Sequence, residues 1–435
     1  MKKLFYILVG CLGLTYQGVA QTPVPAPAQS TPILLEGGTA HLGNGEVIQN
    51  SLIGFADGKL TVVQSADGAF DKSSFKVVNI AGKHVYPSFI LPNSQMGLVE
   101  VSSVRAMSDA RERGTMNPNI RSAISYNTDS EFIPTMRFNG ILLAESAPIG
   151  GVISGTSSVM EMEGWNWEDA AHTLDKGLHV NWPSRISRRF DFATFTVKES
   201  TNKKYGEEVN ALKDFFTAAS RYGSEKEKVT NLKMEAMQGL FDGSKVLMLH
   251  VGGAKEIVEA VKFAQAQDIQ KITVVTSSDA LYVADFLATN KIPVVLPPTQ
   301  RVPQRTNIAI DLPYELPHLL TQKGVMVSLS NEGKMAGNAR NLPFFAGTAV
   351  AYGMDKEEAL KTITSNTAEA LGIADRVGTL TVGKDATLFV SEGDALDYNG
   401  NILNLAFISG KEVTLSGRQQ ELYERFSAKY GHEKK

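Results

Sequence analysis

Hydrophobic and polar positions alternate in two different ways along this chain of 435 residues. Short runs with a period of two, separated by Gly and Asp turns, occupy residues 33–80, and a similar pattern returns at residues 378–413. Such alternation is typical of a small antiparallel sheet. The two ends of the chain therefore predict one composite β-sandwich, built from residues 33–85 and 375–416.

The middle of the chain, residues 86–374, follows another pattern. Apolar runs of strand length alternate with amphipathic stretches of helix length, such as residues 245–250, 254–266, 271–275, 293–296, 325–329 and 356–371. Strands that alternate with helices predict parallel βαβ units, and the length suits one distorted (β/α)8 TIM barrel. A doubly wound sheet is the rival, but no nucleotide-binding glycine loop is visible. The tail, residues 417–435, is expected to hold a short helix at 418–430.

The first 20 residues have the pattern of an export signal. Two lysines precede an apolar stretch at residues 4–14, and small residues before Gln21 fit a cleavage site after Ala20. The residues around Cys11 also resemble a lipobox, which would make Cys11 a lipid anchor. A Pro-rich linker follows at residues 21–32. We expect a periplasmic or secreted protein, with a lipoprotein attached through Cys11 as the alternative.

Charge and cysteine content narrow the class of partner. The formal net charge is −3 and no long run of Lys and Arg occurs, which argues against nucleic acid. The only cysteine lies in the expected export signal, so the mature fold would contain no disulfide. No other apolar run reaches the ~20 residues that a transmembrane span needs. We therefore expect a small-molecule ligand.

Several motifs resemble those of metal-dependent amidohydrolases of the imidazolonepropionase-like type. Residues 82–90 (GKHVYPSFI) are similar to the segment that leads into the first barrel strand of that family. Residues 362–373 (TITSNTAEALGI) and 378–390 (GTLTVGKDATLFV) are similar to two later motifs, and residues 340–344 and 349–353 look like a secreted subgroup. The resemblance implies hydrolysis of a non-peptide C–N bond in a small cyclic amide or dipeptide-like substrate. In that family a metal ion activates the attacking water.

The resemblance also implies where metal ligands would stand. The family uses an HxH pair ending strand one, single histidines ending strands five and six, and an aspartate ending strand eight. In this chain those positions hold, in order, Asn93 and Gln95, His250, Thr276, and Asn331 or Glu332. Side-chain amides are weak ligands for zinc. We therefore expect a depleted centre that binds no metal tightly, with one divalent ion such as zinc as the alternative.

Two interpretations of function remain open. In the first, the protein is a functional single-metal amidohydrolase that uses His250 as ligand and Glu332 as ligand or general base. In the second, it is weakly active or non-catalytic, and binds a small ligand through the polar residues of the former metal pocket, Asn93, Gln95, Thr276 and Asn331. Such a protein could also act as a homo-oligomer or as a subunit beside an intact amidohydrolase. Ligand loss on several strands favours the second. His84 and His179 lie in strand-like runs and are interpreted as structural.

Overall fold

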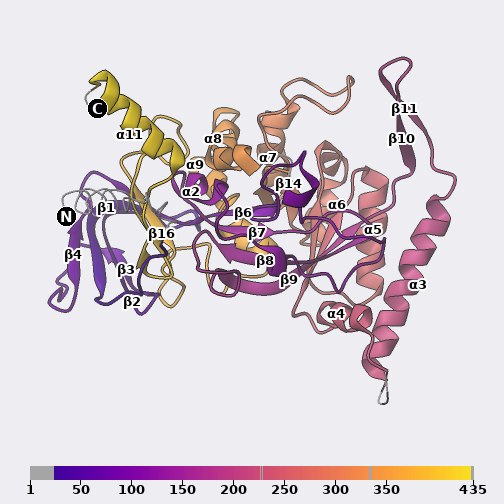
Figure 1. The fold of residues 1–435 in the computed structure, drawn as a ribbon, viewed down its shortest axis with the longest axis horizontal. Coiled ribbons are helices and arrows are strands. Elements are labelled where there is room, and N and C mark those ends of the chain that lie inside the picture. The colour runs from indigo at the N-terminus through magenta and orange to yellow at the C-terminus, as the bar shows by residue number, and fades with distance from the viewer. Residues whose placement is uncertain (1–23, 226, 228, 333–335, 433–435) are drawn as a thin grey trace, which may run out of the picture.

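The computed structural model describes residues 24–225, 227, 229–332 and 336–432. The expected export signal, residues 1–20, lies outside the described residues. The chain forms a small sheet domain and a larger barrel, which lie side by side along the long axis of the molecule (Figure 1). The N-terminal strands and the last strands share the small domain, as the sequence predicted.

The small domain is one eight-stranded sheet made from both ends of the chain. Its path is β18-β17-β16-β5-β1-β2-β3, and β4 pairs in parallel with β1. Apolar side chains are buried on both faces, and Phe55 from the N-terminal part meets Phe407 from the C-terminal part edge to face, with ring centroids 4.9 Å apart. The strands are β1 (Ile33–His41), β2 (Val47–Ala56), β3 (Lys59–Ser65), β4 (Lys76–Asn79), β5 (His84–Pro87), β16 (Leu388–Ser391), β17 (Leu403–Ile408) and β18 (Lys411–Glu412).

The barrel is a second eight-stranded sheet, in the path β15-β14-β13-β12-β9-β8-β7-β6. Most of its strands are apolar runs that are buried along their length, as expected for strands covered on both faces. The distorted (β/α)8 barrel with a composite sheet domain is therefore confirmed. The barrel strands are β6 (Phe89–Ser94), β7 (Ile141–Ser146), β8 (Ile153–Glu161), β9 (Ala171–Asn181), β12 (Val246–His250), β13 (Ile272–Val275), β14 (Val294–Leu296) and β15 (Val327–Leu329).

The distortion has a specific origin in β8. This strand pairs antiparallel with both of its neighbours, β7 and β9, whereas the other neighbouring strands of the barrel run parallel. The connections before and after β8 are residues 147–152 and 162–170, and neither contains a helix. A parallel crossover needs about a dozen or more residues. These connections are too short for one, so the chain reverses instead.

The barrel closes between its first and last strands without a direct ladder in the described residues. The segment between two short helices, α9 (Lys356–Lys361) and α10 (Ser365–Ala370), fills that seam. The backbone N–H of Leu329 in β15 donates to the carbonyl of Thr362 at 3.0 Å, and the N–H of Ile90 in β6 donates to the carbonyl of Ile363 at 2.8 Å. The predicted amphipathic stretch 356–371 is thus two helices, and the break between them satisfies backbone groups of the barrel.

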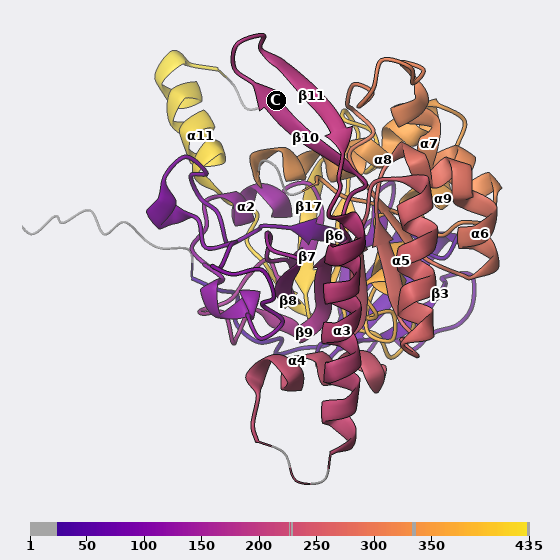
Figure 2. The same cartoon turned by 90° about the vertical axis from the view of Figure 1, so that its right-hand side faces the viewer.

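Helices cover the outside of the parallel half of the barrel (Figure 2). A long helix pair and a two-stranded hairpin stand further out at the right-hand end in Figure 1. None of the helices in the described part of the chain is both long and apolar enough to cross a bilayer. The remaining helices and strands are α2 (Phe132–Arg137), β10 (Ile186–Asp191), β11 (Thr196–Thr201), α3 (Tyr205–Ser224), α4 (Leu232–Phe241), α5 (Ala254–Ala266), α6 (Ala284–Thr289), α7 (Leu312–Gln322), α8 (Leu342–Ala351) and α11 (Arg418–Tyr430). Short 3-10 turns are η1 (Arg105–Met107), η2 (Ser122–Ser125), η3 (Ser278–Val283) and η4 (Ala336–Asn341).

Candidate functional site

Three hydrogen-bonded side chains, each from a different strand, lie inside the barrel near the C-terminal ends of its strands. Nε2 of His179 in β9 lies 3.1 Å from Oε1 of Glu145 in β7. Nδ1 of the same histidine lies 2.9 Å from Nε2 of His250, the last residue of β12. His179 and Glu145 are almost fully buried, whereas His250 is partly exposed. Since strand C-termini carry the functional groups of a (β/α)8 barrel, this is the candidate site.

Glu145 is held as a carboxylate by several donors. Burial alone would raise its pKa, but the charge and hydrogen bond of His179 and the hydroxyl of Ser157, at 2.6 Å, outweigh burial and lower the pKa of this group. The backbone N–H of Asn93 adds a bond to Oε2 at 2.7 Å. The ionised Glu145 accepts a hydrogen bond from Nε2–H of His179. One proton then lies between Nδ1 of His179 and Nε2 of His250.

His250 is uncharged at neutral pH. Burial among protein atoms, followed by the proximity of His179, lowers the pKa of the His250 ring to about 3, and Glu145 opposes this only in part. A neutral imidazole has one nitrogen that donates and one that accepts. Because Nε2 faces His179, the nitrogen left for a ligand is Nδ1.

Asn93 and Gln95, which align with the HxH pair of the family, lie at the end of β6. Asn93 meets the site through its backbone, and its φ of +48° lies in the left-handed region, which Asn tolerates better than most residues. Gln95 follows β6 and is partly exposed. Of these two residues, only Asn93 has a bond to the Glu145–His179–His250 chain among the interactions found.

Two further candidates follow the barrel strands beyond His250. Thr276 comes directly after Val275, the residue of β13 that pairs with His250, and its buried hydroxyl has no hydrogen-bond partner among the described residues. Such an unpaired buried hydroxyl is rare in folded proteins. Asn331 follows β15 and is buried. Thr276 and Asn331 follow β13 and β15, two strands of the same rim that are separated by β14.

Glu332, the proposed ligand or base, lies at the same rim with a positive φ of +60°. Its Oε2 is 3.7 Å from Nη1 of Arg301, which comes from the loop after β14. A left-handed conformation is costly for Glu, and such conformations concentrate at functional sites. The guanidinium beside it is a competing cation for any metal ion at this carboxylate.

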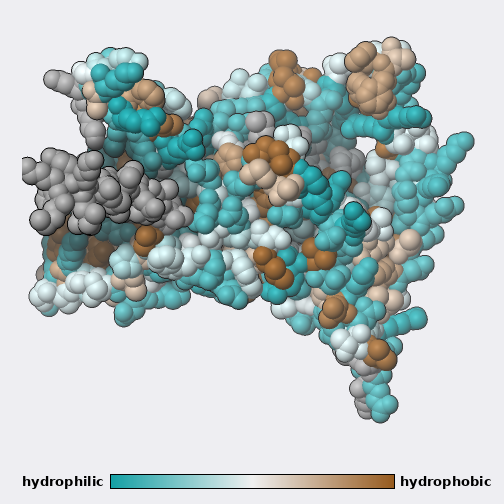
Figure 3. Space-filling view, in the orientation of Figure 1, coloured by the Kyte–Doolittle hydropathy of each residue, from teal (hydrophilic) through white to brown (hydrophobic). Residues whose placement is uncertain are grey.

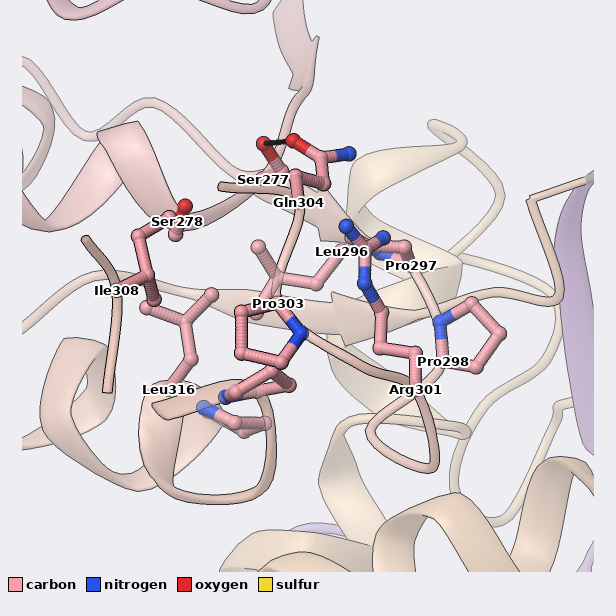
Figure 4. A pocket seen from close by; sticks show the side chains of 12 residues that line it. Ser277, Ser278, Leu296, Pro297, Pro298, Arg301, Pro303, Gln304, Ile308 and Leu316 are labelled. Atoms are coloured by element: carbon pink, nitrogen blue, oxygen red, sulfur yellow. Dashed lines mark hydrogen bonds between the residues drawn. The ribbon is translucent and has the colours of Figure 1, made fainter. Parts of the chain in front are cut away.

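Arg301 also borders a small apolar cavity beside the segments that follow β13 and β14 (Figure 4). Prolines supply much of its wall, and Arg301 lies beside Pro297 and Pro298, while the hydroxyl of Ser277 donates to Gln304 at 3.1 Å. The cavity of about 20 Å³ holds roughly one water molecule. It is a packing gap under the loop and is too small for a substrate.

The donor set of the barrel does not fit a tightly held metal ion. In the part of the chain that the structure describes, no three or more His, Cys, Asp or Glu side chains are placed to hold one ion. Both ring nitrogens of His179 and one of His250 are engaged in hydrogen bonds. Zinc requires about four ligands of the imidazole, thiolate or carboxylate type in structural sites and three in catalytic ones.

The sequence interpretation missed Glu145 and did not place His179 beside His250. A glutamate inside the wholly buried strand Ile141–Ser146 was a usable signal, because a buried carboxylate requires partners. His179 was read as a structural residue, and its place between Glu145 and His250 depends on the pairing of β9 with β12. No sequence spacing reveals that register.

The fold and the site together define a (β/α)8-barrel protein of the type that carries its chemistry at the strand C-termini. The model of the amidohydrolase family matches residues 144–414, which is more than half of the chain. The protein therefore belongs to the amidohydrolase family. The matched region starts inside β7, so Asn93 and Gln95 lie outside it.

The chain is also similar to individual known proteins. It is 23% identical over 263 residues to an imidazolonepropionase of Flavobacterium psychrophilum, which covers 55% of this chain and 60% of that protein. A crystal structure of an amidohydrolase from Thermotoga maritima has a TM-score of 0.74 and 23% identity, and the match covers 88% of this chain and 99% of the other. An adenosine deaminase from Xanthomonas campestris with bound zinc has a TM-score of 0.54 and 14% identity, over 92% and 98% of the two chains. At these identities the structures share the fold.

Proposed function

We propose that this protein uses the amidohydrolase frame to bind a small polar ligand at the barrel rim, with little or no metal-dependent hydrolysis. The observation that supports this is that His179 already forms hydrogen bonds with both His250 and Glu145. Three of the four ring nitrogens of His179 and His250 are used in the chain that ends on Glu145. A metal ion would have to break that buried chain to gain a second imidazole.

The remaining groups suit a neutral ligand. Nδ1 of the uncharged His250 would form one hydrogen bond with the ligand, and the unpaired hydroxyl of Thr276 would form another. Cyclic amides and dipeptide-like molecules offer N–H and C=O groups of the required kind. The protein would meet such a ligand in the periplasm or outside the cell, as the export signal predicted from the sequence implies.

Metal analysis of the purified protein, with and without added zinc, tests the proposal. We expect far less than one zinc per chain in the wild type, unchanged in His250→Ala. The matched control is His84→Ala, because His84 belongs to a second pair of histidines, with Nδ1 3.0 Å from Nε2 of His41, in the sheet domain. Near-stoichiometric zinc that is lost in His250→Ala and kept in His84→Ala would establish the alternative, a single-metal hydrolase.

Ligand binding is tested separately by thermal shift with a panel of cyclic amides and dipeptides. A ligand of the rim should raise the melting temperature of the wild type and of His84→Ala. It should have little effect on His250→Ala or Thr276→Val. A compound that stabilises all four proteins equally binds elsewhere, and this result would count against the site.

A further inference from the structure

The hairpin β10–β11 projects from the barrel without a core of its own. Both strands are exposed along nearly their whole length. At the tip, Phe190, Phe192 and Phe195 are 44%, 79% and 79% exposed, and the ring of Phe190 contacts the other two edge to face. An isolated two-stranded hairpin is at best marginally stable in water. Exposed aromatic side chains at the end of such an element mark an interaction surface.

The C-terminal helix α11 also exposes aromatic side chains, and cations lie beside them. Only one of its 13 residues is buried, and Tyr423, Phe426 and Tyr430 are 54%, 45% and 63% exposed. Cζ of Arg425 lies 5.1 Å from the ring centroid of Phe426, and Nζ of Lys429 lies 5.2 Å from that of Tyr430. Among the residues that the structure describes, the four most exposed phenylalanines all lie on the hairpin or on α11.

The loop between β14 and α7 forms a third projection with exposed apolar side chains. Val302 and Ile310 in this loop are 77% and 73% exposed. The loop rises between α11 and the hairpin in Figure 1, and all three stand on the upper side in Figure 2 as well. Tan and brown side chains lie at the ends of the hairpin and of the projection between it and α11 (Figure 3). Because three separated points define a plane, a flat and extended surface can contact all three at once.

The hairpin and the residues after it carry more positive charge than they balance. Residues 186–204 hold five basic and two acidic side chains, for a net charge of +3, in a chain whose total is −3. Arg189 on β10 pairs directly with Lys198 on β11, and like charges at such opposite positions are destabilising. Asp191 forms an ion pair with Lys198, but Arg189 has none among the described residues. This arrangement favours an anionic partner.

We propose that this side of the molecule docks on a membrane surface that contains anionic phospholipid such as phosphatidylglycerol. The rings of Phe192 and Phe195 enter the boundary between headgroups and acyl chains, and Arg189 and the cations on α11 contact lipid phosphates. Exposed apolar side chains beside cations bind proteins to anionic membranes in this way, without a spanning segment. The hairpin and the loop before α7 follow β9 and β14, so the membrane lies on the side of the barrel that carries the candidate site. The proposal is independent of the proposed ligand binding.

Co-sedimentation with lipid vesicles tests the docking. The protein is expressed from its full sequence and purified in the form that the cell produces, so that all variants share the N-terminus of the wild type. Each Lys or Arg near an anionic surface contributes about fivefold in affinity. We therefore expect the wild type to bind vesicles of mixed phosphatidylglycerol and phosphatidylcholine at least about tenfold more tightly than vesicles of phosphatidylcholine alone. Salt at about 0.5 M should remove most of this difference by screening.

Variants of the hairpin separate its apolar and charged contributions. Phe192→Ser/Phe195→Ser should weaken binding to the anionic vesicles at least about tenfold, because two large apolar side chains no longer leave water. Arg189→Gln should weaken it about fivefold and leave binding to phosphatidylcholine unchanged. The matched control, Val229→Ser/Leu232→Ser, removes two side chains that are 91% and 67% exposed near the α3–α4 connection, at the lower end of the molecule in Figure 1. It should bind like the wild type.

A wild type that does not bind the anionic vesicles, or that binds both kinds of vesicle equally, would overturn the proposal. So would binding that survives Phe192→Ser/Phe195→Ser, or that the control variant loses to the same extent. Sedimentation velocity without lipid tests the other occupant of this surface. A dimer that dissociates in the hairpin variant would mean that a second copy covers the tip, and this result would also reject membrane docking. Circular dichroism checks that each variant is folded, as expected for changes at exposed positions.

Discussion

Oε1 of Glu357 on α9 lies 2.7 Å from Nδ1 of His41 on β1, so one hydrogen bond links the barrel to the sheet domain. Nε2 of His41 continues to His84 at 3.0 Å, and the ring of His41 stacks on Tyr86 with centroids 4.4 Å apart. The molecule thus contains two chains of the form Glu–His–His. One lies in the barrel and the other lies at the junction of the two domains.

Glu357→Gln should weaken that junction. The amide can keep one hydrogen bond but loses the charge beside His41, so we expect the free energy of unfolding to fall by about 1–2 kcal/mol. Urea unfolding followed by circular dichroism measures it. Glu358→Gln on the same helix is the control, because Glu358 pairs with Lys361 at a more exposed position and should cost less than about 0.5 kcal/mol. An equal fall in the free energy of unfolding in both variants would show that the bond between Glu357 and His41 adds no more stability than the exposed pair does.

Asp385→Asn should destabilise the protein far more. Asp385 lies in the GKDA-like motif and contacts Lys59 at 2.5 Å, His172 at 3.0 Å and Arg376 at 2.9 Å while almost fully buried. Removal of its charge leaves these donors without a buried anion, at a cost of about 3 kcal/mol. Asp71→Asn, at an exposed position of the small domain, is the control in the same unfolding experiment. A loss below about 1 kcal/mol at Asp385 would contradict the structural role of this motif.

The same carboxylate contributes to acid sensitivity. Burial would raise its pKa, but the hydrogen bonds of His172 and Lys59 and the charge of Arg376 lower the pKa of Asp385 to about 2, from an ordinary 3.8. A lowered carboxyl pKa gives stability that is complete above pH 3.8 and is lost as the pH falls towards 2. The difference in unfolding free energy between the wild type and Asp385→Asn should therefore be constant above about pH 5 and shrink below pH 4.

His250 should not titrate in the neutral range. Its pKa of about 3 lies below the ordinary 6.5, so between these values the unfolded chain binds a proton that the folded protein does not. Stability must then fall as the pH falls through this window, by up to about 1.4 kcal/mol per pH unit. The His250→Gln variant should show a shallower dependence. NMR of the imidazole nitrogens checks the folded state directly, and a midpoint near 6.5 for His250 would refute the buried pairing with His179.

Removal of metal should leave the fold unchanged. Since the donors near the rim are engaged with one another, we expect the melting temperature after dialysis against EDTA to match that of the untreated protein within about 1 °C. Zinc added back should have no effect of its own. A fall of several degrees on chelation, reversed by zinc, would require a metal site that the described residues do not provide.

Much of the fold could be predicted from apolar periodicity. The strand Val246–His250 and the helices Ala254–Ala266 and Arg418–Tyr430 stand where the patterns placed them. The strand Ile153–Glu161 could not be found in this way, because Ser and Thr occupy much of its buried length and form hydrogen bonds there. The hairpin β10–β11 could not be predicted for the opposite reason. It buries almost no side chains, so its sequence shows no alternation of buried and exposed positions.

The candidate site was less predictable than the fold. His250 was placed from a resemblance to the family, and it does end a barrel strand. The roles of Asn93, Gln95, Thr276, Asn331 and Glu332 remain predictions, and the Thr276→Val variant above tests one of them. Glu145 and His179 meet His250 only because β9 pairs with β12, and because Glu145 on β7 reaches His179 across the intervening strand β8. That information lies in strand pairing and is absent from any local motif.

The reversed strand β8 has a consequence for anyone who wishes to alter ligand selectivity. In an all-parallel barrel, every rim loop follows its strand, and variants are made after the strand ends. Here Ile153, the start of β8, pairs with Val180 near the end of β9, so the rim segment at this position is 147–152, which precedes the strand. Randomisation of the residues after Glu161 would change the opposite end of the barrel. A library aimed at the ligand should instead diversify the turn around Gly150 and Gly151, although both glycines have a positive φ and are best kept.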